Sequence, residues 1–260
     1  MNDSWVALRR FTRARIALGR AGHALPTSAL LDFQLAHAQA RDAVHVPWDR
    51  EAFAEQLRTL GEEVLVLDTP VGSRGEYLRR PDLGRILTEA SRTRLKNVNA
   101  DPADVALIVT NGLSSTAVER HGIPLLREIV QGCRSRHIRI APVSLVANGR
   151  VALSDDIGSV LAARVAVIIV GERPGLSAAD SLGIYLTFAP REGNTDADRN
   201  CISNVRPPDG MSYKAAAAKL LYLAREALKR GFSGVALKEE NEDLLGGDGI
   251  KGDSDGSLIA

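Results

Sequence analysis

A carboxylate, Glu172, follows directly after an apolar run at residues 165–170, and a Pro-Gly turn comes soon after it. A carboxylate at the end of a buried strand can accept hydrogen bonds from the amide groups of a ligand, and such charge-assisted hydrogen bonds are strong. The alternative is a surface ion pair with the neighbouring Arg173, which would contribute little. The position therefore favours a ligand-binding role for Glu172.

Cys201 lies in a polar segment, residues 194–204, that is too polar for a core and too long for a minimal connection. Long loops of this kind are usually functional or disordered. A nucleophilic thiol needs a base held close to it, and no histidine follows His137 in the chain. We therefore expect Cys201 to be a buried or ligand-contacting thiol, with a nucleophilic role as the alternative.

A third polar cluster begins at Asn111, after the apolar run at residues 105–109. Gly112 and the helix that follows could cradle a phosphate. Equally, Gly112 could permit a tight turn while Ser114 or Ser115 caps that helix. The sequence contains neither the G-x-G-x-x-G nor the Walker pattern, which argues against a nucleotide cofactor of those kinds. It does not decide between the two interpretations of this loop.

The other titratable residues form no catalytic pattern. The histidines are too far apart for a compact metal site, so we predict no metal bound by side chains. Asp155 and Asp156 precede a predicted helix, where capping and the helix dipole explain both. Because no acid–base pair is visible, we expect the chain to hold a cofactor while the chemistry happens elsewhere.

Strands alternating with helices must position these residues. The predicted strands are short runs rich in Val and Ile, at residues 64–67, 105–109, 138–146, 165–170, 184–188 and 234–237. The predicted helices between them are residues 114–121, 124–136, 156–163 and 212–230. This order indicates an α/β fold, a Rossmann-like, doubly wound and mostly parallel sheet. Ligands bind outside the carboxyl ends of such strands, where all three polar clusters are expected.

Composition limits the function classes. The 260 residues carry a formal net charge of +1 and are 45% hydrophobic, which is typical of a globular protein with no general attraction to nucleic acid. No apolar run is long enough for a membrane span, and the two cysteines fit a cytoplasmic protein. We predict a helical arm (1–60) with two or three helices, a Rossmann-like domain (61–237) and an acidic, Gly-rich, disordered tail (238–260).

Five segments, in this order and spacing, resemble the small subunit of ethanolamine ammonia-lyase. They are FTRARIALGRAG at 11–22, HAQARDAV at 37–44, NGLS at 111–114, GERPGL at 171–176 and RNCISN at 199–204. The resemblance implies a Rossmann-like domain with an N-terminal helical arm. It also implies that adenosylcobalamin lies between this chain and a large TIM-barrel subunit that binds ethanolamine.

Carried over position by position, the resemblance places the cobalamin contacts on Val151, Glu172 and Cys201. The reaction implied is a radical conversion of ethanolamine to acetaldehyde and ammonia, with the hard chemistry supplied by the cofactor. The sequence departs from the family at Asn111, where aspartate is expected, in the near absence of an N-terminal extension, and in the acidic tail. Whether the enzyme lies in a bacterial microcompartment stays open.

Two other functions remain as alternatives. A stand-alone Rossmann-like hydrolase would use Cys201 as its nucleophile, and the missing partner base argues against it. A non-catalytic binding module would use the basic helical arm, and the polar loops at the strand ends argue against it.

Overall fold

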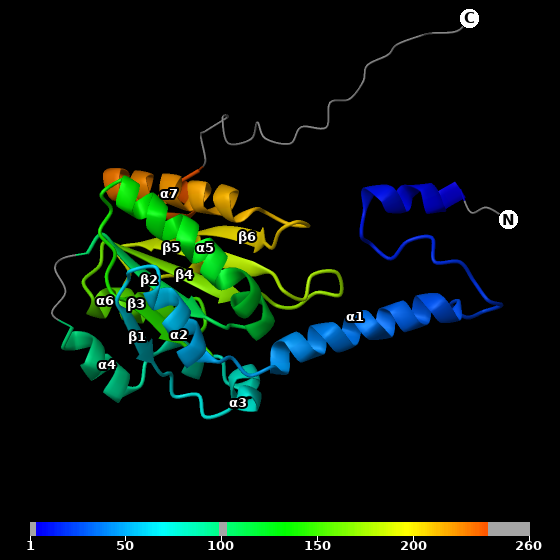
Figure 1. Cartoon of the computed structure of the whole chain (residues 1–260), viewed down its shortest axis with the longest axis horizontal. Helices are drawn as coiled ribbons and strands as arrows, with labels where there is room; N and C mark the ends of the chain where they lie inside the picture. The colour runs from blue at the N-terminus through cyan, green and yellow to red at the C-terminus, as the bar shows by residue number, and fades with distance from the viewer. Residues whose placement is uncertain (1–3, 99–102, 239–260) are drawn as a thin grey trace, which may run out of the picture.

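The computed structural model describes residues 4–98 and 103–238 and contains a six-stranded mixed sheet of order β1-β3-β2-β4-β5-β6 (Figure 1). Four strands run parallel: β1 (Val64–Leu67), β2 (Val105–Thr110), β3 (Val143–Val146) and β4 (Val165–Gly171). The last two, β5 (Leu182–Phe188) and β6 (Arg199–Val205), are antiparallel to their neighbours. The predicted class, a mostly parallel α/β fold with an N-terminal helical arm, is confirmed.

Helices cover both faces of this sheet. One face packs against α2 (Arg50–Arg58), α5 (Ser115–Ser135) and α7 (Tyr213–Arg230), and the other against α4 (Glu89–Lys96) and α6 (Leu153–Val160). The remaining elements are α1 (Thr27–His45), α3 (Arg74–Arg79) and the 3-10 helices η1 (Ser4–Phe11), η2 (Leu83–Arg85), η3 (Asp196–Asp198) and η4 (Gly234–Ala236). None of the described helices is both long and apolar enough to cross a membrane.

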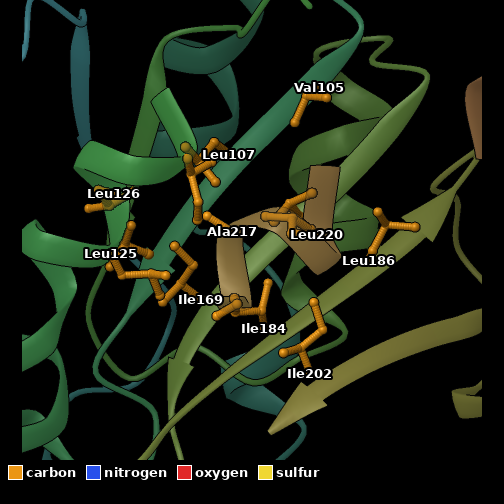
Figure 2. Close-up of a cluster of buried hydrophobic side chains, with 14 of the residues drawn as sticks. Val105, Leu107, Leu125, Leu126, Ile169, Ile184, Leu186, Ile202, Ala217 and Leu220 are labelled. Atoms are coloured by element: carbon orange, nitrogen blue, oxygen red, sulfur yellow. The ribbon is translucent and has the colours of Figure 1, made fainter. Parts of the chain in front are cut away.

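The larger core lies between the sheet and the layer of α5 and α7. Figure 2 shows Leu107 of β2 and Ile169 of β4 beside Leu125 of α5 and Leu220 of α7. Strands β2 and β4 are buried along their whole length, as expected for central strands covered on both faces. Burial of these side chains fixes where the strands end, and therefore where the loops beyond them can lie.

Helix α5 is continuous, whereas two helices separated near Pro124 were predicted. The proline removes one backbone hydrogen bond from the helix interior. The apolar face nevertheless runs on through Leu125, Leu126 and Ile129, all buried against the sheet. Tertiary packing therefore outweighs the local cost of the proline.

The predicted strand at residues 234–237 is wrong, because this segment forms η4. Gly234 has a positive φ of 78°, which a regular strand does not allow. The Asn200 side chain bonds the backbone here, donating to the carbonyls of Gly234 and Leu237 and accepting from the Gly234 N–H. These bonds replace those of a sheet ladder.

The sixth strand, β6, occupies the segment that was predicted to be a polar loop. It forms the edge of the sheet, and of its residues only Arg199, Ile202 and Val205 are buried. An edge strand pairs on one side only, so most of its side chains can be polar, and the apolar pattern that marks a buried strand is absent. The same edge position leaves Cys201 exposed.

The N-terminal arm projects from the domain, and η1 is drawn apart from α1, to which a connecting segment joins it (Figure 1). Of the 19 residues of α1, only Ala43 is buried. Helix α2, also within residues 1–60, instead packs Phe53, Ala54 and Leu57 into the larger core. Asp49 caps α2, since its side chain accepts from the Ala52 N–H. The tail that was predicted to be disordered lies, apart from Lys238, outside the described residues.

Candidate functional site

A pocket of about 400 Å³ opens where the parallel strands end. The loops after β2, β3 and β4 contribute Leu113, Arg150 with Val151, and Glu172 respectively, and β5 contributes Tyr185. Two of the predicted site residues, Val151 and Glu172, therefore line one cavity. This is the edge at which an open α/β sheet binds its ligands.

Glu172 is held by hydrogen bonds from two serines. Its Oε2 accepts from Ser181 Oγ at 2.5 Å and its Oε1 accepts from Ser203 Oγ at 2.5 Å, with a longer bond of 3.4 Å from the Asn204 N–H. A carboxylate has about four acceptor positions, so these bonds fix the side chain and still leave it able to accept from a ligand. No ion pair with Arg173 occurs among the described contacts of Glu172.

The antiparallel direction of β5 and β6 explains how Ser203 reaches Glu172. The loop after Phe188 was expected at the carboxyl edge of the sheet, together with the loops after β2 and β4. This prediction is wrong, because Phe188 pairs with Val165 at the opposite end of β4. Strand β6 then returns along β5 and brings Cys201 to Asn204 back to the pocket side. Of the polar segment at residues 194–204, only the second half therefore lies near the pocket.

Cys201 lies beside the pocket through Tyr185, its partner in the β5–β6 register. Although Cys201 is exposed at the sheet edge, neighbouring groups partly desolvate its thiol, which raises the thiol pKa; the charge of Glu172 raises it further, and a hydrogen bond with Tyr185 offsets this only in part. An activated nucleophile requires the opposite shift. Of the described histidines, His121 bonds to Tyr213 and Asp180 instead, so the nucleophile hypothesis finds no support here.

Arg150 and Tyr77 are pocket residues that the sequence did not reveal. The Arg150 guanidinium lies 4.0 Å from the centre of the Tyr77 ring and donates to the Tyr77 carbonyl. Tyr77 in turn donates to the Gly149 carbonyl, and its ring is also approached by Arg74 at 4.8 Å. Arg150 could have been found from its position beside Val151. Tyr77 could not, because it lies in a segment without apolar periodicity.

The Asn111–Ser114 loop forms a turn and a helix cap, and the N–H groups of Leu113 and Ser114 are already bonded within the protein. Leu113 N donates to the Gly171 carbonyl, and Ser114 N donates to the Asn111 carbonyl. Ser114 Oγ caps α5 by accepting from Ala117 N. The structure therefore favours the turn-and-cap interpretation over a phosphate cradle. The Asn111 side chain is held at both ends, because its Nδ2 donates to Ser115 Oγ and its Oδ1 accepts from the Asn148 N–H.

Asp155 and Asp156 do more than the helix dipole explains. Asp155 forms a buried two-pronged ion pair with Arg199 at 2.7 and 2.6 Å, which ties α6 to β6. Asp156 accepts from the Leu87 N–H at 2.8 Å and pairs with Arg92. The explanation by capping and the helix dipole was therefore incomplete, because Arg199 and Arg92 are too distant in sequence for a local pattern to reveal these ion pairs.

His121 is a packing residue that also forms an acid–base pair invisible in the sequence. Its ring nitrogens contact the Tyr213 hydroxyl at 2.8 Å and Asp180 at 3.3 Å, and burial is the main cause that lowers the pKa of His121. This pair faces a different cavity, beside Arg13 and Arg206. Among the residues that the structure describes, no group of three or more His, Cys, Asp or Glu side chains could hold a metal ion.

The fold and the site together define an α/β ligand-binding protein with a pocket at the carboxyl edge of its parallel strands. The model of the ethanolamine ammonia-lyase light chain family matches residues 2–238, and the chain belongs to that family. It is thus a subunit of a carbon–nitrogen lyase.

Curated relatives carry the same description. The chain is 55% identical to the ethanolamine ammonia-lyase small subunit of Azotobacter vinelandii (strain DJ), across 92% of this chain and 90% of that protein. The small subunit of Ralstonia nicotianae is also 55% identical, with the same coverage. That of Pseudomonas putida (strain W619) is 54% identical across 92% of this chain and 89% of the relative.

Proposed function

We propose that this chain forms one wall of the adenosylcobalamin site of ethanolamine ammonia-lyase, with Val151, Glu172 and Cys201 as its contacts. A large TIM-barrel subunit supplies the opposite wall, and ethanolamine is bound mainly by that subunit. The observation that carries the proposal is the pocket shared by Val151 and Glu172, with Cys201 adjacent through Tyr185.

The chemistry of the pocket fits a corrin. A corrin is a broad disc fringed with amides, so it needs apolar contact across its face and hydrogen-bond acceptors at its rim. Leu113, Val151 and Val170 offer the apolar contact, and Glu172 keeps acceptor capacity at the edge. Gly183 leaves room for Glu172, since a Cβ there would lie 2.9 Å from Glu172 Oε1.

When bound, adenosylcobalamin supplies the radical chemistry that removes ammonia from ethanolamine. The residues of this chain bind and orient. Ser181 and Ser203 fix the Glu172 carboxylate, and the apolar wall excludes water from that side of the pocket. Cys201 acts as a neutral contact, because its raised pKa keeps the thiol protonated at neutral pH.

The exposed arm supports the need for a partner subunit. Phe11, Leu31 and Leu35 are 73%, 57% and 60% exposed, although apolar side chains of this size normally gather in a core. Large exposed apolar surfaces mark interaction sites. We assign the arm to contact with the large subunit, and we place the assembled enzyme in the cytoplasm. In this proposal, residues 1–60 form the helical arm and residues 61–237 form the cobalamin-binding domain.

Reconstitution tests the proposal. The purified chain alone should release no acetaldehyde from ethanolamine, and neither should the large subunit alone. Mixing both with adenosylcobalamin should restore turnover. Activity of the lone chain, or full activity of the large subunit without this chain, would show that the proposal is wrong.

A further inference from the structure

A second cavity, of about 460 Å³, adjoins the proposed corrin pocket and shares Arg150 and Val151 with it. Its other lining includes Arg85, Asp196 and Arg199. We call it the arginine pocket. Because Arg150 and Val151 belong to both cavities, one extended ligand could occupy both.

The arginine pocket carries excess positive charge. Arg199 is neutralised by its buried pair with Asp155, and the fully exposed Asp196 lies 3.8 Å from Arg199 Nε. Arg85 and Arg150, in contrast, form no ion pair with any carboxylate of the residues that the structure describes. Two unneutralised cations therefore border one cavity.

Two buried donors in this pocket also lack partners. Within the described part of the chain, Arg150 Nε and Arg199 Nε are buried without a hydrogen bond, and the Arg199 side chain is only 4% exposed. A buried donor without an acceptor is unfavourable, because it has lost its hydrogen bonds to water, so proteins seldom keep one. The Tyr77 ring holds Arg150 in place, which lowers the entropy lost when an anion binds.

We propose that the arginine pocket is a phosphodiester subsite, in which Arg85 and Arg150 bind the phosphate of the cofactor's nucleotide tail. The inference rests on the proposed function, because it takes the neighbouring pocket to hold the corrin. A phosphodiester is the anionic side group of cobalamin, and guanidinium groups match phosphate oxygens in both charge and geometry.

The test measures binding to the assembled complex of this chain with the large subunit, by visible absorption after equilibrium dialysis. Three ligands separate the parts of the tail: adenosylcobalamin, adenosylcobinamide phosphate, which keeps a phosphate but lacks the base, and adenosylcobinamide, which lacks both. Arg150→Gln and Arg85→Gln should each weaken the first two ligands roughly tenfold. Binding of adenosylcobinamide should stay unchanged for Arg85→Gln, since Arg85 lies outside the corrin pocket, and should fall less than that of the other two ligands for Arg150→Gln.

Two further variants serve as controls. Arg150→Lys keeps the charge but not the guanidinium geometry and should lose less affinity than Arg150→Gln. Arg127 is an exposed arginine on α5, and Arg127→Gln should change none of the three affinities. Equal losses for all three ligands, or no loss for any, would overturn the phosphate subsite. A loss confined to adenosylcobalamin would assign the contact to the base and would overturn it too. If the wild-type complex bound none of the ligands, the proposed function itself would fail.

Discussion

Replacing Asp155 by asparagine should destabilise the protein strongly, because it removes one partner of a buried ion pair. The Asp155 and Arg199 side chains are only 7% and 4% exposed, and two hydrogen bonds of 2.7 and 2.6 Å join them. Asparagine keeps one acceptor but turns an N–H group toward the guanidinium. Removing one partner of a buried pair costs about 3–5 kcal/mol, since the remaining charge stays buried.

Urea unfolding of the full chain measures this cost. With a denaturant slope of about 2 kcal/mol/M, the midpoint should fall by about 1.5–2.5 M. Asp196→Asn is the matched control, because Asp196 approaches the same Arg199 but is fully exposed, at 3.8 Å. It should cost about 0.5 kcal/mol or less. Equal midpoint shifts for the two variants would refute the reasoning that burial makes the Asp155 pair important.

Three further outcomes are expected. Gly112→Ala should lower the free energy of unfolding by about 3 kcal/mol in the same assay, since φ is +50° there and the new Cβ would lie 2.2 Å from Val170 Cγ2; a neutral result would contradict the geometry. Cys201 should react with iodoacetamide more slowly at pH 7 than an unperturbed thiol, because its pKa is raised, and the rate should still be rising above pH 9; mass spectrometry of the labelled site decides this. Burial lowers the pKa of His121 below 6.5, so the unfolded state binds its proton first. Stability should then fall as the pH drops from 7 through 6.5, and His121→Gln should flatten that slope; an unchanged slope would count against it.

The central sheet could be predicted from the sequence because its pattern is local. Strands β2 and β4 are buried on both faces and therefore read as continuous apolar runs. Strand β6 could not be found in this way, since an edge strand needs no apolar run. Its direction, which decides where Cys201 and Ser203 lie, depends on pairing with β5, and no local pattern records that pairing.

Part of the pocket could also be predicted from a local pattern in the sequence. Glu172 follows a recognisable strand, so its place at the carboxyl edge could be predicted. Val151 came only from the family resemblance, whereas Cys201 was singled out by its polar segment and the resemblance supplied only its ligand. Ser181, Ser203 and Arg150 could not be singled out, because their importance lies in contacts with residues distant in sequence.

Adenosylcobalamin affinity of the assembled complex is the measurement that tests the proposed site most directly. Glu172→Gln should weaken binding roughly tenfold, by removing a charged acceptor from the pocket. The control Glu55→Gln, on the exposed surface of α2, should bind like the wild type. If Glu172→Gln binds the cofactor as tightly as the wild type does, Glu172 is not part of the cobalamin site.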